Sequence, residues 1–268
     1  MTNLGADPSR LSPDFTDAAE RDAAYRVFER QLSKENREGI ADLLENKHIP
    51  AAARVVRDME RWLIEKEGFT KVTTPTIIPA SMLDRMTINE GSSLREQVFF
   101  LEDGRCLRPM LAPGLYEVMR ELKRITGRTV RIFEVGSCFR KDSQGSRHLS
   151  EFTMLNLVEL DGVRDGEQME RLAALASSAM GAVGISDFRL QDEGSAVYGE
   201  TLDIVCGETE VASGSFGPHK LDAEWGIFDV WTGIGFGIER LAMIREGKNS
   251  VRQVGRSTGF LDGWSLKV

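Results

Sequence analysis

The chain has 268 residues, of which 41% are hydrophobic and 28% are charged, as is usual for a folded globular protein. No apolar run is long enough to span a membrane and the N-terminus lacks the pattern of a secretory signal, so we expect a reducing, cytoplasmic setting. The net charge of −8 argues against bulk attraction to nucleic acid but does not exclude a local basic surface.

The cysteines and histidines are scattered and form no CxxC or CxxH pattern. We therefore expect no zinc site built from these residues. Cys106, Cys138 and Cys206 are interpreted as small buried hydrophobic side chains.

The first predicted element is a long helix that follows a polar tail of about 15 residues. Thr16 or Asp17 can cap it, and the helix-forming residues continue to about residue 45. Four basic residues recur at spacings of four, four and three and so share one face: Arg26, Arg30, Lys34 and Arg37. This face is either an ordinary solvated surface laced with glutamates or a stripe that follows an RNA backbone.

A second helix, a glycine, a strand and a proline follow as one unit. Pro50 fits the first turn of the helix, and apolar residues between Val55 and Leu63 fall on one of its faces. Gly68 suits the end of the helix, and the β-branched segment 69–75 ends at Pro75.

The rest of the chain contains more predicted strands than helices. Strands are predicted at 97–101, 130–135, 152–160, 188–191, 201–205 and 209–213. Helices are predicted at 113–126, 166–183 and 236–246. Because several strands follow one another without an intervening helix, the sequence indicates an α+β fold with an antiparallel sheet flanked by helices.

A run of alternating glycines near the C-terminus is the most informative feature of the chain. Between residues 233 and 237 three glycines alternate with apolar residues, which leaves one face of a strand without side chains. Arg240 stands where this strand becomes a helix, a suitable place for a cation that meets phosphate.

A predicted hairpin contributes a second candidate for nucleotide binding. Segments 132–142 and 148–156 are strand-like and are joined by a turn-rich loop. Arg140 lies at the entry to the loop and Phe152 on the returning strand, a pair that suits a phosphate and a base. The alternative for Arg140 is a surface ion pair with Asp142 or Glu151.

Three of these units resemble motifs 1, 2 and 3 of class II aminoacyl-tRNA synthetases. They are, in chain order, the helix and strand that end at Pro75, the hairpin that carries Arg140, and the glycine run before Arg240. Segments 107–113, 115–116, 151–156, 197–199 and 224–227 further resemble the catalytic domain of the pyrrolysyl-tRNA synthetase family, and the similarity extends from about residue 20 to the C-terminus. The resemblance implies that residues 1–50 form a tail and helical extension that contacts tRNA. It implies that residues 51–268 form the catalytic domain.

The resemblance implies a reaction in which an amino-acid carboxylate attacks the α-phosphate of ATP and the acyl group then passes to tRNA. It assigns catalytic roles to Arg140 on the α-phosphate and to Arg240 on the γ-phosphate. Phe152 would stack on adenine over the bare Gly235. The residues placed nearby in the loop of the hairpin are Asp142, His148 and Leu149. Glu210 and Ser213 would hold Mg²⁺.

The resemblance also implies a deep amino-acid pocket, lined by Ala112, Leu115, Tyr116, Met119, Val158 and Trp231. Plain core packing remains the alternative for Leu115, Met119 and Val158. Asn156 would bind the distal amide of the substrate and Tyr198 would close over its ring. A buried asparagine needs partners for its amide, which favours a ligand-binding role for Asn156.

The implied partners are tRNA, pyrrolysine or a similar large lysine derivative, and a second copy of the chain through residues 51–75. A separate tRNA-binding protein is a further possibility that the sequence leaves open. Four departures from the family pattern leave the substrate preference open: Gly114, Asp142, Val158 and Thr232. Two alternatives remain, a class II synthetase for another large amino acid and a non-catalytic paralogue that binds RNA or a partner. The presence of both phosphate-facing arginines disfavours the second.

Overall fold

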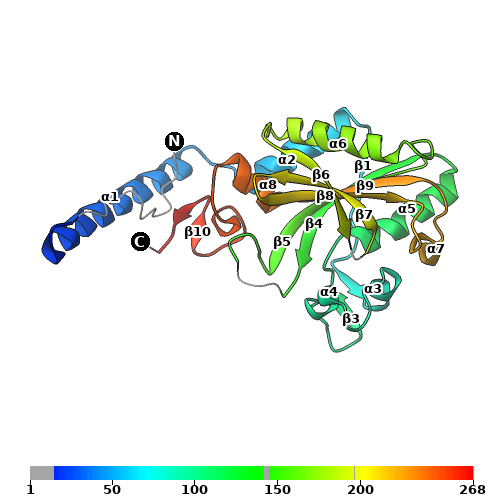
Figure 1. Cartoon of the computed structure of the whole chain (residues 1–268), viewed down its shortest axis with the longest axis horizontal. Helices are drawn as coiled ribbons and strands as arrows, with labels where there is room; N and C mark the ends of the chain where they lie inside the picture. The colour runs from blue at the N-terminus through cyan, green and yellow to red at the C-terminus, as the bar shows by residue number, and fades with distance from the viewer. Residues whose placement is uncertain (1–14, 142–144, 196, 268) are drawn as a thin grey trace.

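The computed structural model describes residues 15–141, 145–195 and 197–267. A seven-stranded sheet in the order β1-β4-β5-β9-β8-β7-β6 forms the centre of the molecule (Figure 1). Its strands are β1 (Thr70–Lys71), β4 (Val130–Phe139), β5 (Glu151–Leu160), β6 (Arg189–Ser195), β7 (Gly199–Cys206), β8 (Thr209–Gly217) and β9 (Trp231–Gly237). All neighbouring pairs are antiparallel except β1 and β4. The predicted α+β class and antiparallel sheet are confirmed.

Three helices cover one face of the sheet: α2 (Ala51–Glu65), α6 (Gln168–Ala182) and α8 (Ile238–Arg245) (Figure 1). The apolar face of α2, which includes Met59 and Leu63, is buried in one core together with Leu155 and Leu157 of β5. This apolar face, which we expected at a subunit interface, is therefore used inside the chain.

The other face of the sheet is covered only in part, by α5 (Ala112–Thr126), the short α7 (Asp222–Trp225) and a small projecting region (Figure 1). That region consists of β2 (Ile77–Pro79), α3 (Ser81–Arg85), α4 (Ser93–Glu96) and β3 (Arg105–Leu107). The predicted strand at 97–101 is wrong, because only an isolated bridge joins Phe100 to Cys106. Phe100 and Leu101 are exposed, so these strand-forming side chains find no larger sheet to pack on.

Helix α1 (Ala18–Glu45) extends away from the body and buries none of its residues (Figure 1). Asp17 caps it by accepting a hydrogen bond from Glu20 N at 2.8 Å, as the sequence predicted. The C-terminal hairpin of β10 (Phe260–Leu261) and β11 (Trp264–Ser265), which follows the 3₁₀ helix η2 (Val251–Gln253), holds the helix. The Asn36 side chain bonds both the N–H and the carbonyl of Ser265.

Among the described residues, no helix has both the length and the apolar character needed to cross a membrane. The three cysteines are free and buried, as predicted. Burial raises the pKa of the Cys138 thiol to about 12, so this thiol stays protonated at neutral pH.

Candidate active site

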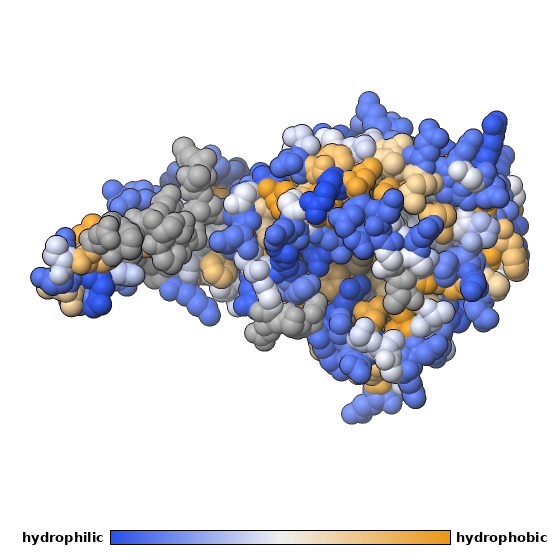
Figure 2. Space-filling view, in the orientation of Figure 1, coloured by the Kyte–Doolittle hydropathy of each residue, from blue (hydrophilic) through white to orange (hydrophobic). Residues whose placement is uncertain are grey.

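A cavity of about 440 Å³ lies on the partly covered face of the sheet, between the strands and the start of α5. Figure 2 shows hydrophobic side chains in and beside a hollow above the α3–β3 region. The cavity brings together sixteen residues predicted from the sequence: Ala112, Leu115, Tyr116, Met119, Arg140, His148, Leu149, Phe152, Asn156, Val158, Tyr198, Glu210, Ser213, Trp231, Gly235 and Arg240. Asp142 lies outside the described residues, and the four basic residues predicted to meet tRNA lie apart from the cavity, exposed on α1.

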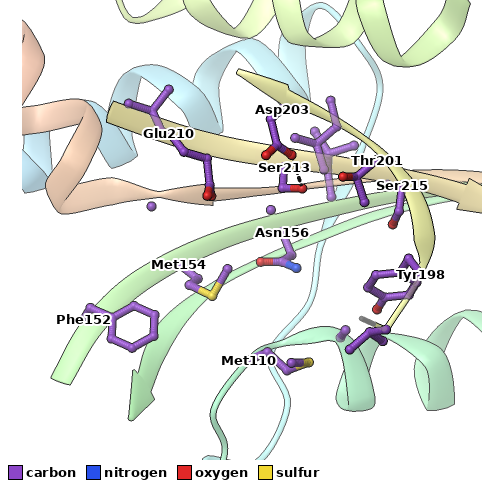
Figure 3. A pocket seen from close by; sticks show the side chains of 18 of the residues that line it. Met110, Phe152, Met154, Asn156, Tyr198, Thr201, Asp203, Glu210, Ser213 and Ser215 are labelled. Atoms are coloured by element: carbon purple, nitrogen blue, oxygen red, sulfur yellow. Dashed lines mark hydrogen bonds between the residues drawn. The ribbon is translucent and has the colours of Figure 1, made fainter. Parts of the chain in front are cut away.

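Strand β5 forms the floor of the cavity with every second side chain. Phe152, Met154 and Asn156 line it in sequence along one face, while Leu155 is buried in the core on the other face (Figure 3). Gly235 of β9 lies opposite Asn156. A Cβ atom on Gly235 would lie 3.2 Å from both terminal atoms of the Asn156 amide, so the glycine leaves that amide room to face the cavity.

The Asn156 amide stands in the middle of the cavity, between Phe152 and Tyr198 (Figure 3). Its Oδ1 atom is buried and has no hydrogen-bond partner among the described residues. Leaving a buried acceptor unpaired costs about 1–3 kcal/mol, so this atom is poised for a donor from a ligand.

Two arginines and one aromatic ring define the end of the cavity that the sequence predicts to meet the nucleotide, called the nucleotide end below. The Arg140 guanidinium carbon lies 5.3 Å from the Phe152 ring centroid, and Arg140 Nε donates to the Pro109 carbonyl at 2.9 Å. Arg240 Nη1 donates to the Glu210 carbonyl at 2.9 Å and lies 3.5 Å from its carboxylate. Both arginines are only half-buried, so their charge remains accessible to a ligand.

Oxygen atoms from β7 and β8 lie beside this end. Glu210 points toward the cavity, and Ser213 Oγ donates to Asp203 Oδ1 at 2.6 Å (Figure 3). Sequence reasoning missed Asp203. The β7–β8 register that places Asp203 opposite Ser213 is the only signal for it, and that register is known only from the structure. Carboxylate and hydroxyl oxygens with few other ligands suit Mg²⁺, which keeps waters and phosphate oxygens around it, so the residues present fit the implied metal.

The opposite end of the cavity is aromatic and closed. The Tyr116 and Trp231 rings meet edge to face with centroids 5.9 Å apart, and Tyr198 meets Trp231 in the same way at 6.0 Å. Burial raises the pKa of both tyrosines, so both hydroxyls are protonated at neutral pH. The hydroxyl of Tyr116 donates to Asp222, a residue that sequence reasoning did not identify.

A buried ion pair stands directly behind the nucleotide end. Arg108 Nη1 lies 2.7 Å from Glu134 Oε1, and both side chains are almost fully buried. Thr74 donates to the same carboxylate through its backbone N–H and its hydroxyl. Gly114 packs on this cluster, because a Cβ atom there would lie 2.3 Å from the Thr74 hydroxyl oxygen. The departure from the family pattern at Gly114 therefore has a steric reason in this chain.

Comparison with known proteins agrees with this geometry. Residues 40–262 match the model of the class II core domain (F) of tRNA synthetases. The chain belongs to the class II aminoacyl-tRNA synthetase family.

The solved structures sharpen the similarity. A pyrrolysyl-tRNA synthetase structure from Desulfitobacterium hafniense is 46% identical, with a TM-score of 0.89, over 98% of this chain and 94% of that one. A second pyrrolysyl-tRNA synthetase structure from the same organism has a TM-score of 0.88 at the same identity and covers 93% of that chain. The resemblance to pyrrolysyl-tRNA synthetase catalytic domains that the sequence indicated is confirmed.

More distant relatives match over part of the chain. An O-phosphoserine–tRNA(Cys) ligase from Methanoregula boonei is 30% identical over 161 residues, which are 55% of this chain and 28% of that protein. A lysine–tRNA ligase from Syntrophomonas wolfei is 28% identical over 151 residues. The chain spans less than a third of the length of both relatives.

Proposed function

We propose that this chain activates pyrrolysine, or a similarly large lysine derivative, with ATP and transfers the acyl group to the 3′ end of its tRNA. The observation that carries the proposal is the unpaired Asn156 Oδ1 in a cavity with an arginine-lined end and an aromatic end. The extensive similarity to solved pyrrolysyl-tRNA synthetases supports the choice of amino acid. The reaction belongs to the cytoplasm, where tRNA is charged.

In the first step a carboxylate oxygen of the amino acid forms a bond to the α-phosphorus of ATP. The bond from that phosphorus to the bridging oxygen breaks, and pyrophosphate leaves with its electron pair. The carboxylate is already ionised, so the step needs no general base, and catalysis consists of alignment and charge neutralisation. Arg140, which lines the cavity, would meet the α-phosphate and the carboxylate, and Arg240 would meet the outer phosphates.

The base and the metal have separate places at this end. Phe152 offers a ring on which adenine can stack, with the bare backbone around Gly235 across from it. Glu210 and Ser213, with Asp203 behind the serine, would hold Mg²⁺. When bound, the ion supplies positive charge that offsets the charge on the phosphates.

In the middle of the cavity, Asn156 would recognise the distal amide of the substrate. Its Nδ2 group can donate to the amide carbonyl, and its unpaired Oδ1 can accept from an N–H. A site built to pair a polar group strongly rejects analogues that leave that group unpaired. The apolar walls formed by Leu115, Met119 and Val158 would enclose the long aliphatic stem.

A second candidate function is a class II synthetase for another large amino acid, because the chain also matches ligases for lysine and O-phosphoserine over about half its length. ATP–pyrophosphate exchange with pyrrolysine, lysine, O-phosphoserine and phenylalanine separates these candidates. We expect exchange to be fastest with pyrrolysine. If exchange is fastest with another of these amino acids, that amino acid is the substrate in place of pyrrolysine. If no amino acid supports exchange, the result favours a non-catalytic paralogue.

The proposal extends to assembly and to domain roles. Residues 1–50 would form the tRNA-contacting extension of a catalytic domain spanning residues 51–268.

A homodimer through residues 51–75 is proposed on the family resemblance. Ile64, half exposed on the outer side of α2, offers an apolar side chain for this contact. Sedimentation at micromolar concentration tests it: a dimer that Ile64→Asp dissociates is expected, and a monomeric wild type contradicts it. Charging of tRNA by the chain alone tests whether a separate tRNA-binding protein is needed.

A further inference from the structure

Asp222 is a buried carboxylate that the chemistry described above does not use. It begins α7 and is only 1% exposed. Its Oδ1 accepts from the Tyr116 hydroxyl at 2.9 Å, and its Oδ2 accepts from Trp231 Nε1 at 2.7 Å and from His219 N at 2.5 Å. All three of these donors are uncharged. Burying a carboxylate costs free energy, and these three hydrogen bonds come from neutral groups. Packing alone therefore does not explain why this position carries a carboxylate.

The three donors come from three separate parts of the fold. Tyr116 belongs to α5, Trp231 begins β9, and His219 lies in the loop after β8. Tyr116 and Trp231 both line the cavity. One carboxylate therefore fixes the two aromatic walls at the amino-acid end relative to each other.

The same carboxylate supports Tyr198, the residue proposed to close over the substrate. The Tyr198 ring lies 6.0 Å from Trp231 and 6.1 Å from His219 between centroids, and its hydroxyl shares a hydrogen bond with Tyr116. Asp222 thus accepts a hydrogen bond from each of these three residues, although Asp222 itself does not line the cavity.

The backbone around this cluster leaves little freedom for it to rearrange. A Cβ atom on Gly217 would lie 1.9 Å from Trp231 Nε1 and 2.6 Å from Asp222 Oδ2. The chain therefore passes close to the Trp231–Asp222 hydrogen bond at a residue without a side chain. This close packing fixes the indole in one orientation.

We propose that Asp222 is a positioning residue that sets the shape of the amino-acid end of the cavity, and so the choice of substrate, without touching the substrate. This inference rests on the proposed function. A carboxylate suits the role because it can accept from all three donors at once. An asparagine has only one accepting group, and its NH₂ group would face a donor.

The test compares Asp222→Asn with wild type in pyrophosphate exchange. We expect the KM for pyrrolysine to rise about 10-fold, as for the loss of one hydrogen bond. The KM for ATP and the kcat at saturating pyrrolysine should stay within about twofold, because the nucleotide end does not contact Asp222. Tyr116→Phe, which removes one of the three donors, should raise the same KM to a smaller extent.

Glu159→Gln is the matched control. Glu159 is also a fully buried carboxylate, but it pairs with Arg131 and Arg171 and does not line the cavity. It should lower the Tm while both KM values stay unchanged. An unchanged KM for pyrrolysine in Asp222→Asn, or an equal rise of both KM values, overturns the proposal. If Asp222→Asn does not fold, Tyr116→Phe and Trp231→Phe decide the matter by the same comparison.

The proposed function and this inference fail in different ways. If wild type shows no exchange with any amino acid, the proposed function is overturned and the role of Asp222 is read from fluorescence. The difference between wild type and Trp231→Phe isolates the Trp231 emission. We expect Asp222→Asn to shift that emission and Glu159→Gln to leave it in place. An emission unchanged in Asp222→Asn would show that the carboxylate does not position the indole.

Discussion

The two ends of the cavity are built on different principles. At the nucleotide end Arg240 and Glu210 form a loose ion pair at 3.5 Å with a half-exposed carboxylate, and Arg140 is half-buried. At the amino-acid end two tyrosines and a tryptophan are packed and hydrogen bonded around a fully buried Asp222. Under the proposed function, the exposed charges can meet a phosphate that arrives from solvent, whereas the packed rings form fixed walls that select an amino acid by shape.

The nucleotide end gains its rigidity from a layer behind it. The Arg108 carbonyl accepts from Phe139 N at 3.0 Å, and the next carbonyl, that of Pro109, accepts from Arg140. The buried Arg108–Glu134 pair therefore holds the segment on which Arg140 rests. The two ends thus differ in the exposure of the side chains that line the cavity and not in the support of the backbone beneath them.

The largest expected effect comes from breaking this support. Glu134→Ala leaves the Arg108 guanidinium buried without its anion, which should lower the free energy of unfolding by about 3–5 kcal/mol. Urea denaturation measures the loss. Glu121→Ala, at a partly exposed carboxylate on α5, is the control and should leave the free energy of unfolding nearly unchanged. Equal stability of the two variants would show that the pair does not support the site.

The next effect in size tests the charges at the nucleotide end. Arg140→Ala and Arg240→Ala should each slow pyrophosphate exchange by ~100-fold or more, which corresponds to about 3 kcal/mol of lost charge stabilisation. Both side chains lie at the cavity and outside the core, so the Tm should change little. Arg124→Ala, on the exposed surface of α5, is the matched control. Near-normal exchange in both variants would remove these arginines from the reaction.

Most of the fold could be predicted from the sequence, because the apolar period of each long segment matches the face that the segment buries. The alternation in 152–160 and the apolar face of 51–63 appear as β5 and α2 with only small shifts at their ends. The region between β2 and β3 was not predicted, since its helices are four or five residues long and carry no readable period. Strand β1 is shorter than predicted, because only Thr70 and Lys71 pair with β4.

The site was predictable where one local motif carries the chemistry. Arg140, Phe152 and Arg240 each belong to such a motif. Asp203 and Asp222 belong to none, because each acts through a partner outside any such motif, which is 10 residues away for Asp203 and 106 residues away for Asp222. Only the pairing of β7 with β8, and the packing of α7 under α5, bring those partners together.

A smaller effect is expected at the junction of the two ends. Asn156→Ala removes the only amide that lines the cavity among the described residues, so exchange with pyrrolysine should fall by about 10-fold relative to exchange with phenylalanine. ATP affinity should stay within about twofold, since Asn156 lies away from Arg140 and Arg240. Val158→Ala, two residues further along the same face of β5, is the control, because it enlarges the cavity without removing a polar group. An unchanged preference between the two amino acids would take Asn156 out of the specificity site.

The smallest expected effect comes from residues outside the cavity. It tests whether tRNA binds at a surface distinct from both ends of the cavity. Arg26, Arg30, Lys34 and Arg37 are exposed on α1, which the C-terminal hairpin holds at a distance from the sheet (Figure 1). If this stripe follows the tRNA backbone, Arg30→Glu with Lys34→Glu should raise the KM for tRNA several-fold and weaken its dependence on salt. Pyrophosphate exchange should be unchanged, because neither end of the cavity contacts α1.

Arg21→Glu provides the control on the same helix. It makes a charge reversal of the same kind at an exposed position roughly 140° around the helix from Arg26, so a general effect of net charge would appear there too. Aminoacylation at two salt concentrations measures the difference between the variants. Equal loss of activation and charging, or no loss of either, would show that the stripe is an ordinary solvated face. A loss confined to charging would place tRNA recognition on α1, apart from the two ends of the cavity.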